Sequence, residues 1–185
     1  MSDYTDTPYG PVANQILTLA AKIQLLVCDV DGVLSDGRIY MGNAGEELKT
    51  FHTHDGFGIK ALLNAGIDVA VITGRNSQIV QRRMQALGVQ HIYQGQGNKL
   101  PAFEDLLDKL DLMASQAAYI GDDVIDLPVM HSAALGIAVA NAHPSVLQQA
   151  DLATRTRGGE GAVREVCDLL LQARGQLESA QGTSV

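Results

Sequence analysis

The chain has 185 residues, of which 46% are hydrophobic and 18% are charged, so it can form one globular domain with a sizeable core. The formal net charge is −8 and no cluster of lysines and arginines occurs, which argues against a nucleic-acid surface. The apolar runs are too short to span a membrane, and the first ten residues lack the features of a signal peptide, so we expect a cytoplasmic protein. Cys28 and Cys167 each lie in an apolar run and are expected to pack rather than to pair.

Strand-like and helix-like segments alternate along the chain. An amphipathic helix is expected at 13–22, within a leading segment that covers 1–22. Short apolar runs predict strands at 24–29, 67–72, 90–93, 117–120 and 135–139. Helices are expected near 57–65, 76–87, 98–110, 124–131, 144–150 and 161–173. This order predicts an α/β fold, a Rossmann-like parallel sheet flanked by helices over 23–173, and the polar stretch 174–185 predicts a flexible tail.

One segment interrupts the alternation. Residues 38–53 contain two strand-like pieces on either side of Gly42-Asn43-Ala44-Gly45, a composition typical of a β-hairpin. This insertion follows the first strand, and at about 16 residues it is too small to form a separate cap domain. We expect it to overhang whatever site lies at the end of that strand.

Polar residues follow several of the predicted strands. The first strand ends in Asp29-Val30-Asp31-Gly32, the second in Thr73-Gly74-Arg75, and the fourth in Gly121-Asp122-Asp123, with Asp126 one helical turn further on. Asn98-Lys99 begins the helix after the third strand. Because ligands of an open parallel sheet bind beyond the carboxyl ends of its strands, we expect these residues to form one site.

The chemistry of this set indicates a metal ion and a phosphate. Neighbouring carboxylates repel each other unless a cation lies between them. Mg²⁺ binds carboxylate oxygens, water and phosphate oxygens. The hydroxyl of Thr73, the backbone N–H of Gly74 and the ammonium of Lys99 are groups that bind the other sides of a phosphate.

The motifs D-V-D-G-V, I-T-G-R, N-K and G-D-D-x-x-D, in this order over residues 22–150, resemble those of the haloacid dehalogenase superfamily, whose members are mostly phosphohydrolases. Longer stretches, among them CDVDGVLSDGRIYMGN, GEELKTF, DGFGIK and GGEGAVREVCDLLL, resemble one family in particular. That family is the 3-deoxy-D-manno-octulosonate 8-phosphate phosphatases of lipopolysaccharide synthesis. The resemblance implies an Mg²⁺-dependent enzyme that acts on a small anionic sugar phosphate.

The resemblance also implies roles for individual residues. Asp29 would be the nucleophile that forms an aspartyl-phosphate, and Asp31 the general acid and then the general base. The carboxylate of Asp29, the backbone carbonyl of Asp31 and Asp122 would hold Mg²⁺.

The remaining residues of the expected site would bind the substrate. Thr73, Gly74 and Lys99 would hold the transferring phosphate. Arg75, Gly58 and Asp126 are expected on the substrate side. Two alternatives stay open: Asp126 could support the metal shell or the following helix, and Arg75 could form a surface salt bridge.

The absence of a cap domain leaves the cover of the site to be explained. The family resemblance implies a homotetramer in which the hairpins pack together and neighbouring subunits complete each active site. The segment containing Gly158, Gly159 and Gly161 would fold over an adjacent mouth, and the alternative is a plain loop that leads to the last helix.

Other interpretations use the same residue types. A receiver domain also combines acidic residues, Mg²⁺, Thr and Lys, but carries its acidic pair on the first strand and its phosphoacceptor on a middle one. A dinucleotide-binding domain would need a G-x-G-x-x-G motif after the first strand, and none is present. A phosphatase for a nine-carbon acid sugar 9-phosphate and a non-catalytic domain that binds Mg²⁺ and phosphate are the two alternatives that the motifs leave open.

Overall fold

Six parallel strands form the central sheet in a computed structural model that describes residues 3–182. These strands are β3 (Leu25–Cys28), β6 (Asp68–Ile72), β7 (His91–Tyr93), β8 (Ala117–Gly121), β9 (Leu135–Ala138) and β10 (Leu152–Ala153). Their order across the sheet is β10-β9-β8-β3-β6-β7. Every residue of β3 is buried between β6 and β8, which explains its uninterrupted apolar sequence.

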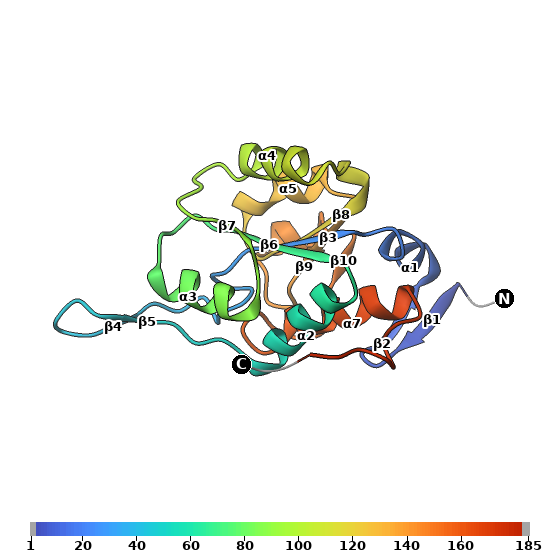
Figure 1. The fold of residues 1–185 in the computed structure, drawn as a ribbon, viewed down its shortest axis with the longest axis horizontal. Coiled ribbons are helices and arrows are strands. Elements are labelled where there is room, and N and C mark those ends of the chain that lie inside the picture. Colours follow the sequence, from blue (N-terminus) through green and yellow to red (C-terminus); the bar gives the residue numbers. More distant parts are fainter. Residues whose placement is uncertain (1–2, 183–185) are drawn as a thin grey trace.

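Helices cover both faces of this sheet, as Figure 1 shows. The helices are α1 (Asn14–Ala20), α2 (Thr53–Asn64), α3 (Gln78–Leu87), α4 (Leu100–Leu110), α5 (Leu127–Ser132), α6 (Pro144–Leu147) and α7 (Ala162–Ala173), with 3-10 turns at Ala114–Gln116 and Val124–Asp126. On one face α7 packs against α1 and α2, and α2 also contacts α3, whereas α4 and α5 pack together on the other. The predicted fold class is confirmed.

Two antiparallel hairpins lie outside the sheet. β4 (Tyr40–Met41) and β5 (Glu47–Leu48) form the insertion, and the Gly42 N–H donates to the Glu46 carbonyl at 2.9 Å across the expected turn. This hairpin projects from the body of the molecule (Figure 1). The other hairpin, β1 (Tyr4–Thr7) with β2 (Gly10–Ala13), has no counterpart in the prediction, because β1 is exposed and polar and β2 begins with Gly-Pro, so neither shows an alternation of apolar and polar residues.

The ends of several elements differ from the prediction. α2 begins four residues early, at Thr53, because the side chain of His52 accepts a hydrogen bond from the His54 N–H at 3.1 Å and so caps the helix. Two-residue β10 was too short to be recognised. No helix among residues 3–182 is long and apolar enough to cross a membrane. The cytoplasmic location stays a prediction.

The expected flexible tail, 174–185, lies partly outside the described residues, which end at 182. Within the described part, Leu177 and Ala180 are partly buried against the core. The Asn64 side chain donates to the Gln181 carbonyl at 2.8 Å, so this stretch lies along α2. Its polar composition did not indicate these contacts, and its mobility stays a prediction.

Candidate active site

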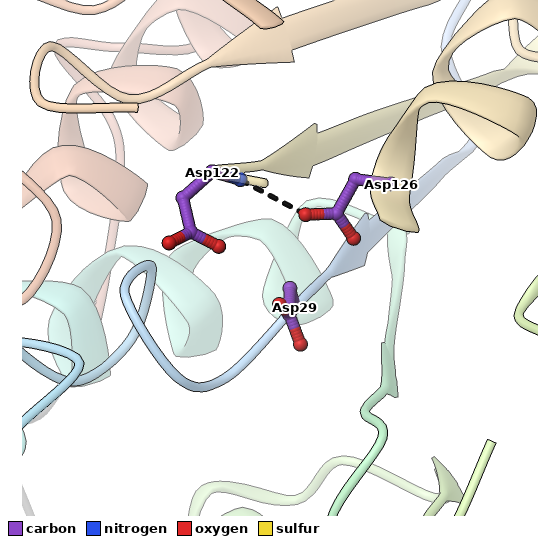
Figure 2. Close-up of side chains that lie close together, drawn as sticks. All are labelled: Asp29, Asp122 and Asp126. Atoms are coloured by element: carbon purple, nitrogen blue, oxygen red, sulfur yellow. Dashed lines mark hydrogen bonds between the residues drawn. The ribbon is translucent and has the colours of Figure 1, made fainter. Parts of the chain in front are cut away.

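The site lies where the order of strand addition to the sheet reverses. From β3 the chain continues to β6 and β7 on one side, and then crosses to β8 and β9 on the other. The crevice at the carboxyl ends of β3 and β8 is therefore the topological switch point, the usual ligand site of such sheets. Asp29 directly follows β3 and Asp122 directly follows β8, and Figure 2 shows both side chains with Asp126 at this edge.

A tight loop, residues 29–37, fixes the end of β3 and is called the site loop below. The carbonyl of Val30 accepts hydrogen bonds from the N–H groups of Val33, Leu34 and Ser35 at 3.2, 2.9 and 2.9 Å. The Val30 N–H donates to Asp29 Oδ1 at 2.7 Å. Gly32 has φ +91°, and a Cβ there would lie 2.0 Å from Asp122 Oδ2, so only glycine lets this carboxylate approach the loop.

Lys99 and Asp126 form a buried ion pair beside Asp29. The Lys99 ammonium lies 2.9 Å from Asp29 Oδ1 and 2.7 Å from Asp126 Oδ1, and its side chain is 1% exposed. Asp126 Oδ1 also accepts from the Tyr119 hydroxyl at 2.6 Å, while Oδ2 accepts from the N–H groups of Asp122 and Asp123 at 3.0 and 3.1 Å. Asp126 thus connects the β8 turn to Lys99, and Lys99 connects it to Asp29.

The buried carboxylates of the cluster raise one another's pKa, so a nearby positive charge would stabilise their ionised forms. Burial, with Asp29, Asp126 and Asp123 nearby, raises the pKa of Asp122 to about 7. Burial also raises the pKa of Asp29, to about 6, because the opposing effect of Lys99 only partly offsets it and Asp126 adds to it. Burial alone would lower the pKa of Lys99, but the two carboxylates beside it raise it, so Lys99 stays charged.

The carboxylates fit a divalent cation. One ligand oxygen each from Asp29, Asp122 and Asp126 lies within 4.8 Å of the others. Asp126 was not among the expected metal ligands, and its two oxygens already accept hydrogen bonds from four protein donors. Within residues 3–182 the Asp122 carboxylate and the Asp31 backbone carbonyl accept no hydrogen bond, so both are available together with Asp29. These hard oxygen donors suit Mg²⁺.

Thr73, Gly74 and Arg75 form a turn at the end of β6. The backbone of Thr73 is held by hydrogen bonds from its N–H to the Tyr93 carbonyl at 2.9 Å and from the Gln96 N–H to its carbonyl at 3.0 Å. Thr73 is buried and Gly74 is exposed. Arg75 Nη2 contacts Glu47 Oε2 of β5 at 2.9 Å, so the turn is joined to the hairpin.

Two residues expected on the substrate side are buried in this structure. Asp126 is fully buried and its carboxylate accepts hydrogen bonds from four protein donors, so it supports the site from below. Gly58 lies under α7, where a Cβ would be 3.0 Å from Cys167 Sγ and 3.1 Å from Arg164 Cδ. Its lack of a side chain lets α2 approach α7 closely, which is a packing role.

Comparison with known proteins identifies the family. Residues 88–166 match the family model of the haloacid dehalogenase-like hydrolases. A 3-deoxy-D-manno-octulosonate 8-phosphate phosphatase of Yersinia pestis is 56% identical over 98% of this chain and 97% of its own. The crystal structure of the phosphatase from that organism superposes on this chain with a TM-score of 0.98, and the superposition covers 100% of both chains. The chain belongs to this phosphatase family.

Two other phosphatases of the family bear on the metal. The Moraxella catarrhalis enzyme is 45% identical, covers 90% of this chain and 95% of its own with a TM-score of 0.88, and was crystallised with a magnesium ion, a phosphate ion and a KDO molecule. The Haemophilus influenzae enzyme is 42% identical, covers 86% of this chain and 93% of its own with a TM-score of 0.83, and was solved in a cobalt-bound form. Relatives of this phosphatase therefore hold a divalent metal.

The segment around Gly158 lies against the site loop of the same phosphatase chain. The Gly159 N–H donates to the Val33 carbonyl at 2.9 Å, and the Gly158 N–H donates to Asn141 Oδ1 at 2.7 Å. A Cβ on Gly158 would lie 1.7 Å from the Gly32 carbonyl oxygen, so the two backbones touch. This contact braces the phosphatase site from within one chain, and the cover of a neighbouring mouth stays a prediction.

Three residues whose contacts support this phosphatase fold and its site were not predicted from the sequence. Lys49, just after β5, contacts the Asp31 carboxylate. Asp55 of α2 accepts the Arg164 N–H at 2.8 Å and so caps the start of α7, and burial raises its pKa to about 7. Tyr119, inside β8, holds Asp126. Only the buried-strand position of Tyr119 carried any signal, since a buried phenol needs a hydrogen-bond partner.

Proposed function

We propose that this phosphatase hydrolyses 3-deoxy-D-manno-octulosonate 8-phosphate to the free sugar acid and phosphate, in lipopolysaccharide biosynthesis. The observation that carries the proposal is the position of Asp29 at the end of β3, with Lys99 on its Oδ1 and Asp122 across the crevice. The names of its relatives point to the same substrate, and the Moraxella catarrhalis structure contains both products of that reaction.

In the first step an oxygen of Asp29 attacks the phosphorus and the bond to the sugar oxygen breaks. The products are an aspartyl-phosphate and a sugar alkoxide, which takes a proton from Asp31. Asp31 is suited to this role because it lies two residues along the site loop and its side chain is 25% exposed, so it can reach a leaving group.

In the second step a water molecule attacks the phosphorus of the aspartyl-phosphate. Asp31, now a carboxylate, takes a proton from that water, and the Asp29 carboxylate is released with inorganic phosphate. Throughout, Lys99 keeps positive charge beside Asp29 and limits the repulsion between this carboxylate and an incoming phosphate. The buried Asp126 holds Lys99 in place.

Asp29, Asp122 and the backbone carbonyl of Asp31 would hold Mg²⁺, which when bound neutralises charge on the phosphate and orients it. Thr73 and the N–H of the exposed residue Gly74 lie at the next strand end and would bind the phosphate oxygens. Arg75 would contact the acid sugar once a substrate competes with Glu47 for its guanidinium.

We also propose that the hairpin assembles the enzyme into a homotetramer that completes the active sites. The side chains of Ile39, Met41 and Leu48 are 58, 72 and 68% exposed on a projecting element, which is unusual for large apolar groups. A second copy of the chain would cover them. Light scattering after gel filtration should give four chains for the wild type and fewer for Met41→Glu/Leu48→Glu, and a wild-type monomer would contradict the proposal.

Phosphate release from defined esters tests the function. The eight-carbon 8-phosphate and nine-carbon acid sugar 9-phosphates would be compared with Mg²⁺, with Co²⁺ and with chelator. We expect metal-dependent turnover that favours the eight-carbon ester. Preference for a nine-carbon ester would overturn the substrate, and failure on every ester would overturn the enzyme assignment.

A further inference from the structure

The hairpin carries one side chain into the site. Lys49 follows β5, and its side chain is only 3% exposed although the neighbouring Leu48 is 68% exposed. The Lys49 ammonium contacts Oδ1 of Asp31. A buried ammonium is costly unless it is paired, so this contact determines where the lysine side chain lies.

The same strand makes a second contact with the site. Alternate residues of a strand point to the same side, so Glu47 and Lys49 share one side of β5 and its extension. Glu47 contacts Arg75 at 2.9 Å, and Lys49 contacts Asp31. The hairpin is therefore attached both to the turn after β6 and to the site loop, and cannot pivot without breaking one of these ion pairs.

The contact with Lys49 leaves one carboxyl oxygen of Asp31 free to transfer a proton. Lys49 occupies Oδ1, and no residue in the range 3–182 donates to Oδ2. When Oδ2 carries the proton, Oδ1 still accepts from the Lys49 ammonium, so the carboxyl group presents Oδ2 in a fixed direction, which is what a general acid needs in order to reach its leaving group. Without Lys49 the Asp31 side chain, on a loop and partly exposed, would sample other rotamers.

We propose that Lys49 is a positioning residue, which orients Asp31 so that Oδ2 delivers its proton to the departing sugar oxygen. The proposal rests on the proposed function, in which Asp31 is the general acid. Lys49 itself exchanges no proton and forms no bond with the substrate. The insertion thus contributes to catalysis within its own chain, in addition to any role between chains.

The test uses the leaving group as the readout. The ratio kcat/KM covers the steps up to the first phosphoryl transfer. An aryl ester such as p-nitrophenyl phosphate releases p-nitrophenolate, a leaving group that needs no proton. The full-length Lys49→Met enzyme should lose about tenfold or more in kcat/KM on sugar and alkyl phosphates, which is part of the roughly 10²–10⁴-fold that a general acid contributes. On the aryl ester it should lose less than about threefold, and the inhibition constant of inorganic phosphate should not change.

Two variants make the comparison specific. Asp31→Asn should show the same dependence on the leaving group, and Lys109→Met, which removes an exposed lysine of α4, should behave as the wild type. Equal losses of Lys49→Met on both kinds of ester, or a weaker affinity for phosphate, would overturn the proposal in favour of a structural or substrate-binding role. If the wild type hydrolyses simple alkyl phosphates but not the eight-carbon ester, the proposed substrate fails and the Lys49 comparison is decided on the alkyl esters.

Discussion

Replacing Asp126 by asparagine should destabilise the chain strongly. All four neighbours of the Asp126 carboxylate donate: the Lys99 ammonium at 2.7 Å, the Tyr119 hydroxyl at 2.6 Å, and the N–H groups of Asp122 and Asp123 at 3.0 and 3.1 Å. An amide has only one accepting atom, so in either orientation its NH₂ faces two donors. Each buried group left unpaired costs about 1–3 kcal/mol, and breaking a buried ion pair typically costs about 3–5 kcal/mol.

We therefore expect Asp126→Asn to lower the free energy of unfolding by about 3–5 kcal/mol. Asp123→Asn is the matched control, because Asp123 is exposed and its accepting contact to the Val124 N–H at 2.7 Å survives in an amide. Its effect should stay within about 0.5 kcal/mol. Urea unfolding followed by circular dichroism, with chelator and at one protein concentration, measures both.

The competing expectation, a substrate contact, predicts the opposite pattern for Asp126. An Asp126→Asn enzyme as stable as Asp123→Asn, but with a raised KM, would refute the assignment of Asp126 as a buried support. The same result would place the carboxylate in the crevice, in conflict with its complete burial.

Three further predictions use other parts of the structure. Gly58→Ala should lower the free energy of unfolding by about 1 kcal/mol and leave KM unchanged. Overpacking against Cys167 costs about 1–3 kcal/mol, while alanine regains up to about 1 kcal/mol of helix propensity. A variant of unchanged stability with a raised KM would instead indicate that Gly58 contacts the substrate. The pKa of Asp55 is raised from 3.8 to about 7, so the folded chain retains a proton that the unfolded chain has lost, and wild-type stability should fall as pH rises between those values. From pH 5.5 to 7.5 the wild type should therefore lose about 2 kcal/mol more in urea unfolding than Asp55→Asn, and parallel losses would contradict this. Mg²⁺ at a hundred times its dissociation constant should stabilise the wild type by about 2.7 kcal/mol and Asp122→Asn far less, and equal gains in thermal unfolding would exclude Asp122 as a ligand.

The sheet and the core of the site could be predicted because short-range patterns determine them. β3 is buried on both faces and therefore reads as an apolar run, and a parallel sheet brings the residues after β3, β6 and β8 to one edge. Asp29 and Asp122 follow directly from these two facts. The turn Gly42–Gly45 could also be predicted, because neighbouring residues alone determine it.

The supporting contacts could not be predicted, since they join residues distant in the sequence. Asp55 caps a helix that begins over a hundred positions later, and Lys49 reaches back eighteen positions to Asp31. Lysine on a hairpin is ordinarily exposed, so its sequence gave no sign of burial. Asp126 and Gly58 were expected on the substrate side because a motif indicates which part of the fold a residue occupies, but not whether the residue faces the crevice or the interior.

The central claim is that Asp29 becomes phosphorylated. Enzyme mixed with substrate labelled in its phosphate would be quenched in acid within milliseconds, digested, and analysed by mass spectrometry. We expect an increase of about 80 Da, one phosphoryl group, on the peptide that contains Asp29, and none in Asp29→Asn, which should also be inactive. Full turnover by Asp29→Asn, or phosphate bound to a different residue, would contradict the mechanism.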